Sequence, residues 1–252
     1  MRTQEKHATR FRSIQTSLLF VIVPAVIISM AVLSLMGYLS SKAIIQTSAG
    51  NEMSQCLSVA MGSIEMSLSN NRMVAETMAR GVEAVQRQAV KGEQTASDWD
   101  AAAYQEILTS FVGSNPETFG GGIWFEPYQY RPEQRYFSPY CMRQNGAVTY
   151  VDNYSLGEGV YYTDQDWYTN AANTTQKSVW SAPYYDEFAQ ISMVTSSAPI
   201  YDETGRFLGV ATADIDLTQM QQMVLSLDVV ANGRAFLIDD TGVYIADEDS
   251  EK

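Results

Sequence analysis

The chain has 252 residues, of which 46% are apolar and 18% are charged, and its formal net charge is −13. Low charge combined with high apolar content excludes an intrinsically disordered chain. All but one of the 29 acidic residues lie within residues 39–252. Because such an acidic body repels phosphate backbones, nucleic acid is excluded as a partner.

An uninterrupted apolar run lies near the amino terminus. No charged residue occurs between Arg12 and Lys42, and residues 18–39 are almost entirely apolar. A membrane-spanning helix needs about 20 such residues, so this run is predicted to cross the cytoplasmic membrane. The bases within residues 1–17 predict a cytoplasmic tail and a periplasmic or extracellular body. A cleaved signal peptide is the alternative, although its apolar core is usually shorter, about 7–15 residues.

Residues 40–92 are predicted to continue from this segment as one long helix. Residues 42–90 contain no proline, and apolar or small residues recur there at spacings of mostly three and four, which places them on one helix face. We interpret this stripe as core or as a dimer seam, and we expect a homodimer. The stripe comprises Ile45, Ala49, Met53, Cys56, Ala60, Ile64, Leu68, Val74, Met78, Val82 and Val85.

Strand patterns follow the helical part of the chain. Asp98 is predicted to cap a second helix that ends near Val112. From Gly120 onward, short turns such as Asn145-Gly146 separate strand-like runs, which predicts an antiparallel sheet. Because helices come before the sheet instead of alternating with strands, the fold class is α+β. Strands are predicted at 120–126, 136–143, 147–151, 179–186, 191–201 and 206–217, and helices at 169–173 and 218–227.

A second unit begins near the carboxy terminus. The hairpin predicted around Asp239–Gly242 is followed by too little chain to build a core of its own. We therefore interpret residues 229–252 as the start of a second subdomain that the sequence truncates, and residues 93–228 as the first subdomain. This organisation is typical of the amino-terminal part of a longer protein.

The sequence offers no motif for a metal or a cofactor. The only histidine, His7, lies in the predicted tail, which excludes a histidine-based catalytic triad or a histidine-ligated metal in the acidic body. Cys56 and Cys141 lie outside any Cys-x-x-Cys pattern. They are expected to be two buried thiols, with a disulfide between them as the alternative. No cofactor is expected.

Aromatic and acidic residues are concentrated between positions 120 and 217. Because side chains alternate along a strand, Tyr184 and Asp186 share one face, and Asp214 lies opposite the apolar face of its own strand. An inward Asp is costly unless it is paired, and a cationic ligand enclosed by rings such as that of Trp167 would provide the partner. The alternative is that Asp214 accepts hydrogen bonds from tyrosine or backbone donors and that Trp167 belongs to the core.

Four segments, in this order, resemble the double Cache sensor domain. The resemblance covers nearly the whole chain and implies an extracytoplasmic ligand sensor, in which a long helix carries two PAS-like subdomains and the membrane-distal one, here residues 93–228, binds the ligand. Such sensors occur in chemoreceptors, sensor kinases and cyclic-dinucleotide enzymes. The segments are Asp166–Ala171, Trp180–Asp186, Met193–Ile200 and Gly209–Leu217.

The resemblance also implies site residues. In the amino-acid-binding branch of this family, an arginine holds the ligand carboxylate, while a Tyr-x-Asp pair and a later Asp hold the ammonium group. Trp167, Tyr184, Asp186 and Asp214 match that pattern. Gln165 stands in the position of the arginine, and glutamine does not replace a bidentate arginine–carboxylate contact.

The remaining candidates are neighbours of these matched positions. The aromatic and acidic character of the whole set suits a cation without a carboxylate and resembles an amine-binding variant of the family. These further ligand-binding candidates are Tyr161, Asp164, Asp166 and Tyr168.

The sequence therefore predicts the non-enzymatic sensing domain of a transmembrane receptor, and a chemotaxis receptor is the favoured class. This domain is predicted to bind a small amine or quaternary ammonium compound. One alternative is an amino-acid sensor of a histidine kinase or diguanylate cyclase. A second is a membrane-anchored hydrolase that uses two carboxylates. A third is a structural or adhesive ectodomain without a ligand.

Overall fold

The structure is a computed structural model that describes residues 14–90, 101–151, 154, 159–227, 234–239, 241–242 and 244–247. Three parts of the chain named above lie outside these described residues: the tail 1–13 with His7, the predicted helix cap Asp98, and the last residues 248–252.

The first element is the long helix α1 (Ile14–Val90). An 18-residue window within it has a mean hydropathy of 2.8 and is not buried, so by length and composition α1 is able to cross a membrane. The chain divides into two compact units, 1–55 and 56–252, and the sheet with its covering helices belongs to the second. The later helices are α2 (Ala101–Ser114), the short 3-10 helix η2 (Tyr162–Asp164), α3 (Asp166–Ala172) and α4 (Leu217–Leu225).

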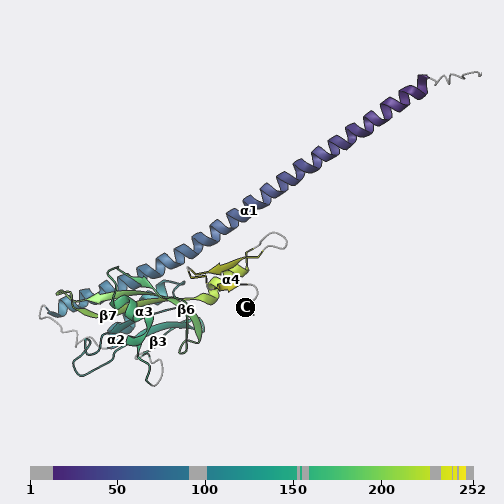
Figure 1. The fold of residues 1–252 in the computed structure, drawn as a ribbon. Helices are drawn as coiled ribbons and strands as arrows, with labels where there is room; N and C mark the ends of the chain where they lie inside the picture. The colour runs from purple at the N-terminus through teal and green to yellow at the C-terminus, as the bar shows by residue number, and fades with distance from the viewer. Residues whose placement is uncertain are drawn as a thin grey trace, which may run out of the picture. The chain divides into compact units, whose positions relative to one another are not determined.

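An antiparallel sheet forms the centre of the second unit (Figure 1). Its described strands lie in the order β3-β2-β1-β7-β6-β4, and β5 also pairs with β6. This sheet, together with the helices that precede and cover it, confirms the α+β fold class. The strands are β1 (Gly120–Phe125), β2 (Tyr140–Gln144), β3 (Ala147–Val151), β4 (Val179–Trp180), β5 (Tyr184–Asp186), β6 (Ile191–Tyr201) and β7 (Phe207–Asp216).

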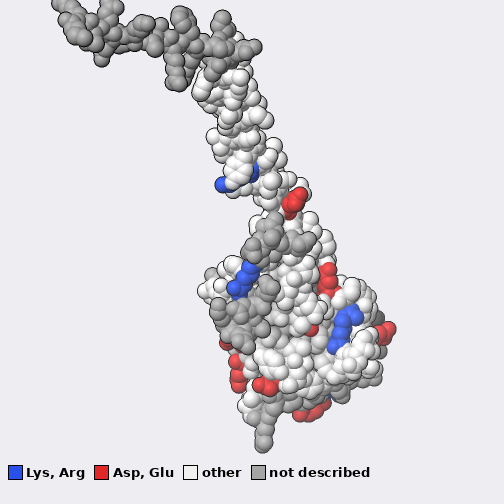
Figure 2. Space-filling model, turned by 90° about the vertical axis from the view of Figure 1, so that its right-hand side faces the viewer, with Lys and Arg blue, Asp and Glu red and all other residues white. Residues whose placement is uncertain are grey.

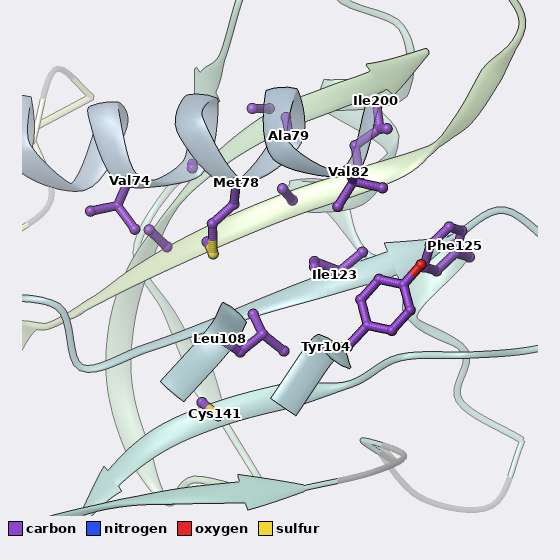
Figure 3. Close-up of a cluster of buried hydrophobic side chains, with 14 of the residues drawn as sticks. Val74, Met78, Ala79, Val82, Tyr104, Leu108, Ile123, Phe125, Cys141 and Ile200 are labelled. Atoms are coloured by element: carbon purple, nitrogen blue, oxygen red, sulfur yellow. The ribbon is translucent and has the colours of Figure 1, made fainter. Parts of the chain in front are cut away.

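One face of the sheet packs against α1 and α2. Met78 and Val82 of α1, Leu108 of α2 and Ile123 of β1 are each at most 1% exposed and belong to one apolar cluster (Figure 3). Fully burying a side chain of this size contributes about 1.5–3 kcal/mol to folding. The stripe predicted along the long helix is therefore core over 74–82.

The opposite face of the sheet is covered by α3, which packs against β6 and β7 (Figure 1). Its buried cluster is mainly aromatic, because β1, β2, η2 and α3 all contribute rings to it, as does Tyr154. The two faces follow from strand alternation: on β7, Ala211 and Ala213 join the apolar cluster, whereas Val210 joins the aromatic one.

Two predicted strands are shorter than the sequence indicates. The predicted strand 179–186 is two strands, β4 and β5, separated by residues 181–183, because Pro183 has no N–H to donate to a ladder. The predicted strand 136–143 begins only at Tyr140, directly after Pro139. Conversely, α3 begins at Asp166 and so includes Trp167, which the sequence pattern placed before the helix.

The last described elements form a hairpin of β8 (Phe236–Ile238) and β9 (Tyr244–Asp247). A third apolar cluster joins Leu237 and Ile245 of this hairpin to Met220 of α4 and to Leu68 of α1. The hairpin predicted around 239–242 is therefore formed, and its apolar side chains pack on the first subdomain.

Candidate functional site

A small cavity lies on the aromatic face of the sheet. Its volume is about 10 Å³, close to the space that one water molecule needs. The described residues that line it are five aromatic ones, two acids, two threonines and a methionine, and none is Lys, Arg or His. They are Trp124, Tyr140, Tyr154, Trp167, Tyr184, Asp186, Met193, Thr195, Thr212 and Asp214.

Asp214 lies on the central strand β7 and is 3% exposed. One carboxylate oxygen, Oδ2, accepts a hydrogen bond of 2.7 Å from the Tyr140 hydroxyl, and Oδ1 accepts one of 2.8 Å from the Thr195 hydroxyl. Burial raises the pKa of Asp214 to about 7, against the opposing effect of these two hydrogen bonds, and the nearby Asp186 raises it further.

Asp186 ends the short strand β5 and is 5% exposed. Its Oδ1 accepts a hydrogen bond of 2.5 Å from the Tyr154 hydroxyl and one of 2.7 Å from the backbone N–H of Ala189. The turn that supplies Ala189 therefore fixes the orientation of the carboxylate toward the cavity. Burial, together with the hydrogen bond to Asp186, raises the pKa of Tyr154, so this hydroxyl keeps its proton at any physiological pH.

A chain of hydroxyl groups links β5, the strand that carries Asp186, to Asp214 on β7. The Tyr184 and Thr195 hydroxyl oxygens are 2.8 Å apart, and Thr195 bonds on to Asp214. Thr195 has one hydroxyl proton, so when it donates to Asp214 it accepts from Tyr184. Displacement of Tyr184 therefore changes the hydrogen bonding of Asp214 through Thr195.

Two of the three consecutive glycines of β1 make room for the rings. A Cβ atom on Gly120 would lie 2.1 Å from the Tyr140 hydroxyl oxygen, and one on Gly122 would lie 2.8 Å from the ring of Trp124. The Trp124 ring is held in that place by its Nε1–H, which donates to the Thr212 hydroxyl at 2.8 Å. Two of the five rings around the cavity thus depend on the absence of side chains on β1.

A second, larger pocket of about 310 Å³ lies beside the cavity. Trp167 and Tyr184 line both spaces, so their side chains separate the inner cavity from this outer pocket. The outer pocket is also lined by Asp164, Gln165 and Asp166, by residues 181–183 and by Tyr185. Elsewhere, on the face shown in Figure 2, acidic side chains are dispersed over the surface.

The structure brings together four of the predicted site residues and distributes the others. Trp167, Tyr184, Asp186 and Asp214 surround the inner cavity, whereas Asp164, Gln165 and Asp166 line the outer pocket. Two residues line neither space. Tyr161 is exposed and stacks on Tyr136 with ring centroids 5.1 Å apart, and the Tyr168 hydroxyl donates to Glu126 at 2.7 Å.

The sequence reasoning missed most of the cavity wall. Trp124, Tyr140 and Tyr154 come from β1, β2 and the segment after β3, none of which lies near α3 or β5 in the sequence. One signal for them was present, because a run of three glycines within a strand indicates a close approach by other groups. The glycine run does not indicate which aromatic residues approach the strand.

Within the described residues, no group of three or more His, Cys, Asp or Glu side chains is placed to hold a metal ion. Cys56 and Cys141 are both free thiols; Cys141 is buried, and its sulfur lies 3.5 Å from the Thr109 hydroxyl.

Comparison with known proteins shows that the part of the chain carrying this site is similar to sensor domains. Residues 104–222, which include every predicted site residue, match the family model described as "Methyl-accepting chemotaxis protein-like, first PDC sensor domain". The chain is 38% identical over 84 residues to the methyl-accepting chemotaxis protein McpC of Bacillus subtilis, covering 33% of this chain and 13% of that protein. It is 25% identical over 206 residues to McpA of Pseudomonas putida, covering 79% of this chain and 31% of that protein. The chain thus spans about a third or less of the length of these relatives.

Solved structures share the fold. The sensory domain of the Campylobacter jejuni chemoreceptor Tlp3 with isoleucine bound aligns with a TM-score of 0.54 and 18% identity, over 78% of this chain and 69% of that one. The extracellular domain of a histidine kinase, mmHK1S-Z3, aligns with a TM-score of 0.52 and 22% identity, over 77% of this chain and 72% of that one. The resemblance to double Cache sensor domains drawn from the sequence is confirmed.

Proposed function

We propose that this chain, whose residues 104–222 match a chemotaxis-protein-like sensor domain, is the ligand-sensing part of a transmembrane chemoreceptor, and that its inner cavity binds the cationic head of a small amine or quaternary ammonium compound. In this proposal residues 18–39 anchor the chain in the cytoplasmic membrane and the body lies outside it. The domain binds its ligand without converting it.

The observation that carries the proposal is the composition of the cavity wall. Asp186 and Asp214 are two buried carboxylates that face one space enclosed by five aromatic rings. Their hydrogen-bond donors are hydroxyl groups and one backbone N–H, all of them neutral. A cation here gains carboxylate partners and about 0.5–2 kcal/mol from each well-placed ring.

The same wall disfavours a zwitterionic amino acid. The carboxylate of such a ligand needs a cationic partner, and the described lining of both spaces contains none. Gln165, which lines the outer pocket, stands where the amino-acid-binding branch carries arginine. Isoleucine is the ligand in the Tlp3 structure, but that protein is only 18% identical to this chain.

Ligand entry requires the wall to move. A cavity of about 10 Å³ is smaller than any organic ammonium group, so a ligand must displace the side chains that separate the two spaces, Trp167 and Tyr184. The ligand would then bias the population of this displaced arrangement by its differential affinity for it.

The segment 181–183 provides a route by which that displacement reaches the second subdomain. It lines the outer pocket and also a groove of about 570 Å³ that Asp239, Thr241 and Ile245 of the last hairpin line. Ser181 and Thr195 exchange two hydrogen bonds, of 2.9 and 3.0 Å, and Thr195 bonds Asp214. Couplings of this kind are worth about 1–3 kcal/mol.

Calorimetric titration of the complete chain in detergent micelles tests the ligand. Tetramethylammonium and isoleucine are compared as ligands for the wild type, for Asp186→Asn and for the control Glu187→Gln, an exposed acid next in sequence that lines neither space. We expect the wild type and the control to bind tetramethylammonium and the Asp186 variant to lose most of that affinity. Tight binding of isoleucine without any binding of ammonium compounds would contradict the proposal.

We also propose a homodimer formed through α1. The stripe residues 74–82 are core of this chain, so they are not available to a second copy. Met61, Met66 and Met73 lie on the same helix and are 59–62% exposed, which leaves them for that contact. Analytical ultracentrifugation in detergent tests this: Met66→Glu should shift the chain toward monomer, and a wild-type chain that stays monomeric with tetramethylammonium would contradict it.

A further inference from the structure

The carboxylate pair in the cavity has no positive partner among the described residues. Asp214 is packed between strands whose side chains facing it are Thr195 of β6, Tyr140 of β2, and Tyr184 and Asp186 of β5. Tyr154, which bonds Asp186, completes the titratable groups around it. Besides the tyrosines, the other titratable group in this set is thus a second acid, Asp186.

Two carboxyl groups at 3% and 5% exposure in one cavity have little water around them, and negative charge on both would be repulsive. A bound cation relieves this, and so does a proton. A proton and an organic cation therefore compete for the carboxyl pair whenever both are available.

The hydrogen-bond network accommodates either choice. The donors to Asp214 are the hydroxyl groups of Tyr140 and Thr195, and a hydroxyl group can accept as well as donate. When Asp214 carries a proton, it donates to one of these oxygens and the hydroxyl turns around. Guanidinium or ammonium donors would not permit this, because they have no acceptor lone pair.

We propose that the proton is a second ligand of this site, which binds Asp214 and competes with the organic cation, so that the domain also responds to external pH. This inference rests on the proposed function, because it names a regulator of the same cavity. When Asp214 is protonated, a cation that enters displaces that proton to the solvent, and the net charge of the cavity is nearly unchanged.

The expected pH dependence follows from this exchange. Burial raises the pKa of Asp214 to about 7, which lies inside the range of external pH that bacteria meet. Below that value, the apparent dissociation constant of the cation should rise about tenfold for each unit by which the pH falls, because a proton must leave first. Above it, the affinity should become independent of pH.

The test is calorimetry of the complete chain in detergent with tetramethylammonium chloride, whose own charge does not change with pH. Titrations at pH 6 and pH 8 in two buffers of different ionisation enthalpy give the number of protons released. We expect about one proton at pH 6 and almost none at pH 8, with affinity about tenfold weaker at pH 6.

Two variants locate the proton. Tyr140→Phe removes a hydrogen bond that lowers the pKa of Asp214, so the midpoint of the pH profile should move upward. Tyr128→Phe, which changes an exposed tyrosine lining neither space, should leave the midpoint in place. A midpoint that does not move in Tyr140→Phe would contradict the assignment to Asp214.

The proton can also be observed without the organic ligand. Trp124 and Trp167 line the cavity, so the tryptophan fluorescence of the chain should titrate with a midpoint near 7, and Asp214→Asn should abolish that transition. Tetramethylammonium binding with the same affinity at both pH values and no proton release would overturn this inference alone. The absence of binding at both pH values, with no fluorescence transition, would overturn it together with the proposed function.

Discussion

The two faces of the central sheet show how one set of strands serves two purposes. Toward α1 and α2, β7 presents Ala211 and Ala213 to a cluster made of apolar side chains. Toward α3, the next positions, Thr212 and Asp214, present a hydroxyl group and a carboxylate to a cavity. The first face contributes to stability by burying apolar surface, whereas the second buries a carboxylate, which costs stability unless that group is hydrogen-bonded or paired.

The same division holds on β1. Ile123 and Phe125 belong to the apolar cluster, whereas Trp124 faces the cavity and Gly122 makes space for its ring. Changes on the two faces should therefore separate folding from binding, and the following predictions test that separation from the largest expected effect to the smallest.

The largest effect is expected on the apolar face. Leu108→Ala removes a fully buried side chain of α2 and should lower the free energy of unfolding by about 2–5 kcal/mol, because it leaves a cavity in the cluster. Thermal unfolding by circular dichroism measures this. The affinity of the folded chain for tetramethylammonium should be unchanged, and a large loss of affinity would show that the two faces are not independent.

On the cavity face, the stability should depend on pH through Asp214. Its folded pKa of about 7 lies above the ordinary value of 3.8 for an exposed aspartate, so the folded chain binds the proton more tightly than the unfolded chain between these values. The contribution of Asp214 is therefore complete below about pH 4 and is lost as the pH rises to about 7, by about 1.4 kcal/mol for each unit.

The measurement is the free energy of unfolding of the wild type minus that of Asp214→Asn. This difference should fall as the pH rises from about 4.5 to 7 and stay level above that. Asp202→Asn is the matched control. Hydrogen bonds from Thr204 and Arg206 lower the pKa of this half-buried carboxyl to about 2, so its contribution is lost only below that window. A flat difference for Asp214→Asn would show that Asp214 is ionised throughout.

A smaller effect is expected from a change at Gly122, on the cavity face of β1. Gly122→Ala would place a Cβ atom 2.8 Å from the Trp124 ring and should cost about 1–3 kcal/mol, because the ring must leave its position. Affinity for tetramethylammonium should fall with it. Gly113→Ala, on α2 with no atom within 4 Å of the added carbon, serves as the control that should retain full affinity. Retained affinity in Gly122→Ala would remove Trp124 from the binding wall.

The smallest effect concerns the outer pocket only. Gln165→Arg supplies the cation that the described lining lacks, so affinity for isoleucine should rise by about tenfold, or about 1.4 kcal/mol. Gln165→Lys is the comparison, because a lysine does not form the bidentate contact and should gain less. An unchanged affinity for isoleucine in both variants would place the ligand carboxylate, if one binds, away from residue 165.

The sequence was a good guide where local periodicity decides the structure. Local patterns in the sequence predict the apolar run 18–39, the stripe along α1 and the strand alternation around Asp214. A regular spacing of apolar residues places them on one face of a helix or strand. The hairpin at 239–242 and the placing of Tyr184 and Asp186 on one side of β5 follow in the same way. The assignment of a binding role to these residues remains a prediction.

The closure of the cavity was decided by tertiary structure. Trp124, Tyr140 and Tyr154 reach Asp186 and Asp214 only because β1 pairs with β7 and β2 pairs with β1, and pairing of strands distant in sequence depends on the whole sheet. Tyr168, adjacent to Trp167 in the sequence, instead turns its hydroxyl to Glu126, because successive residues of a helix point about 100° apart. The sequence by itself determined which residues are acidic, aromatic and inward-facing; only the packed sheet decided which of them face one another, because that depends on contacts between segments that no local spacing encodes.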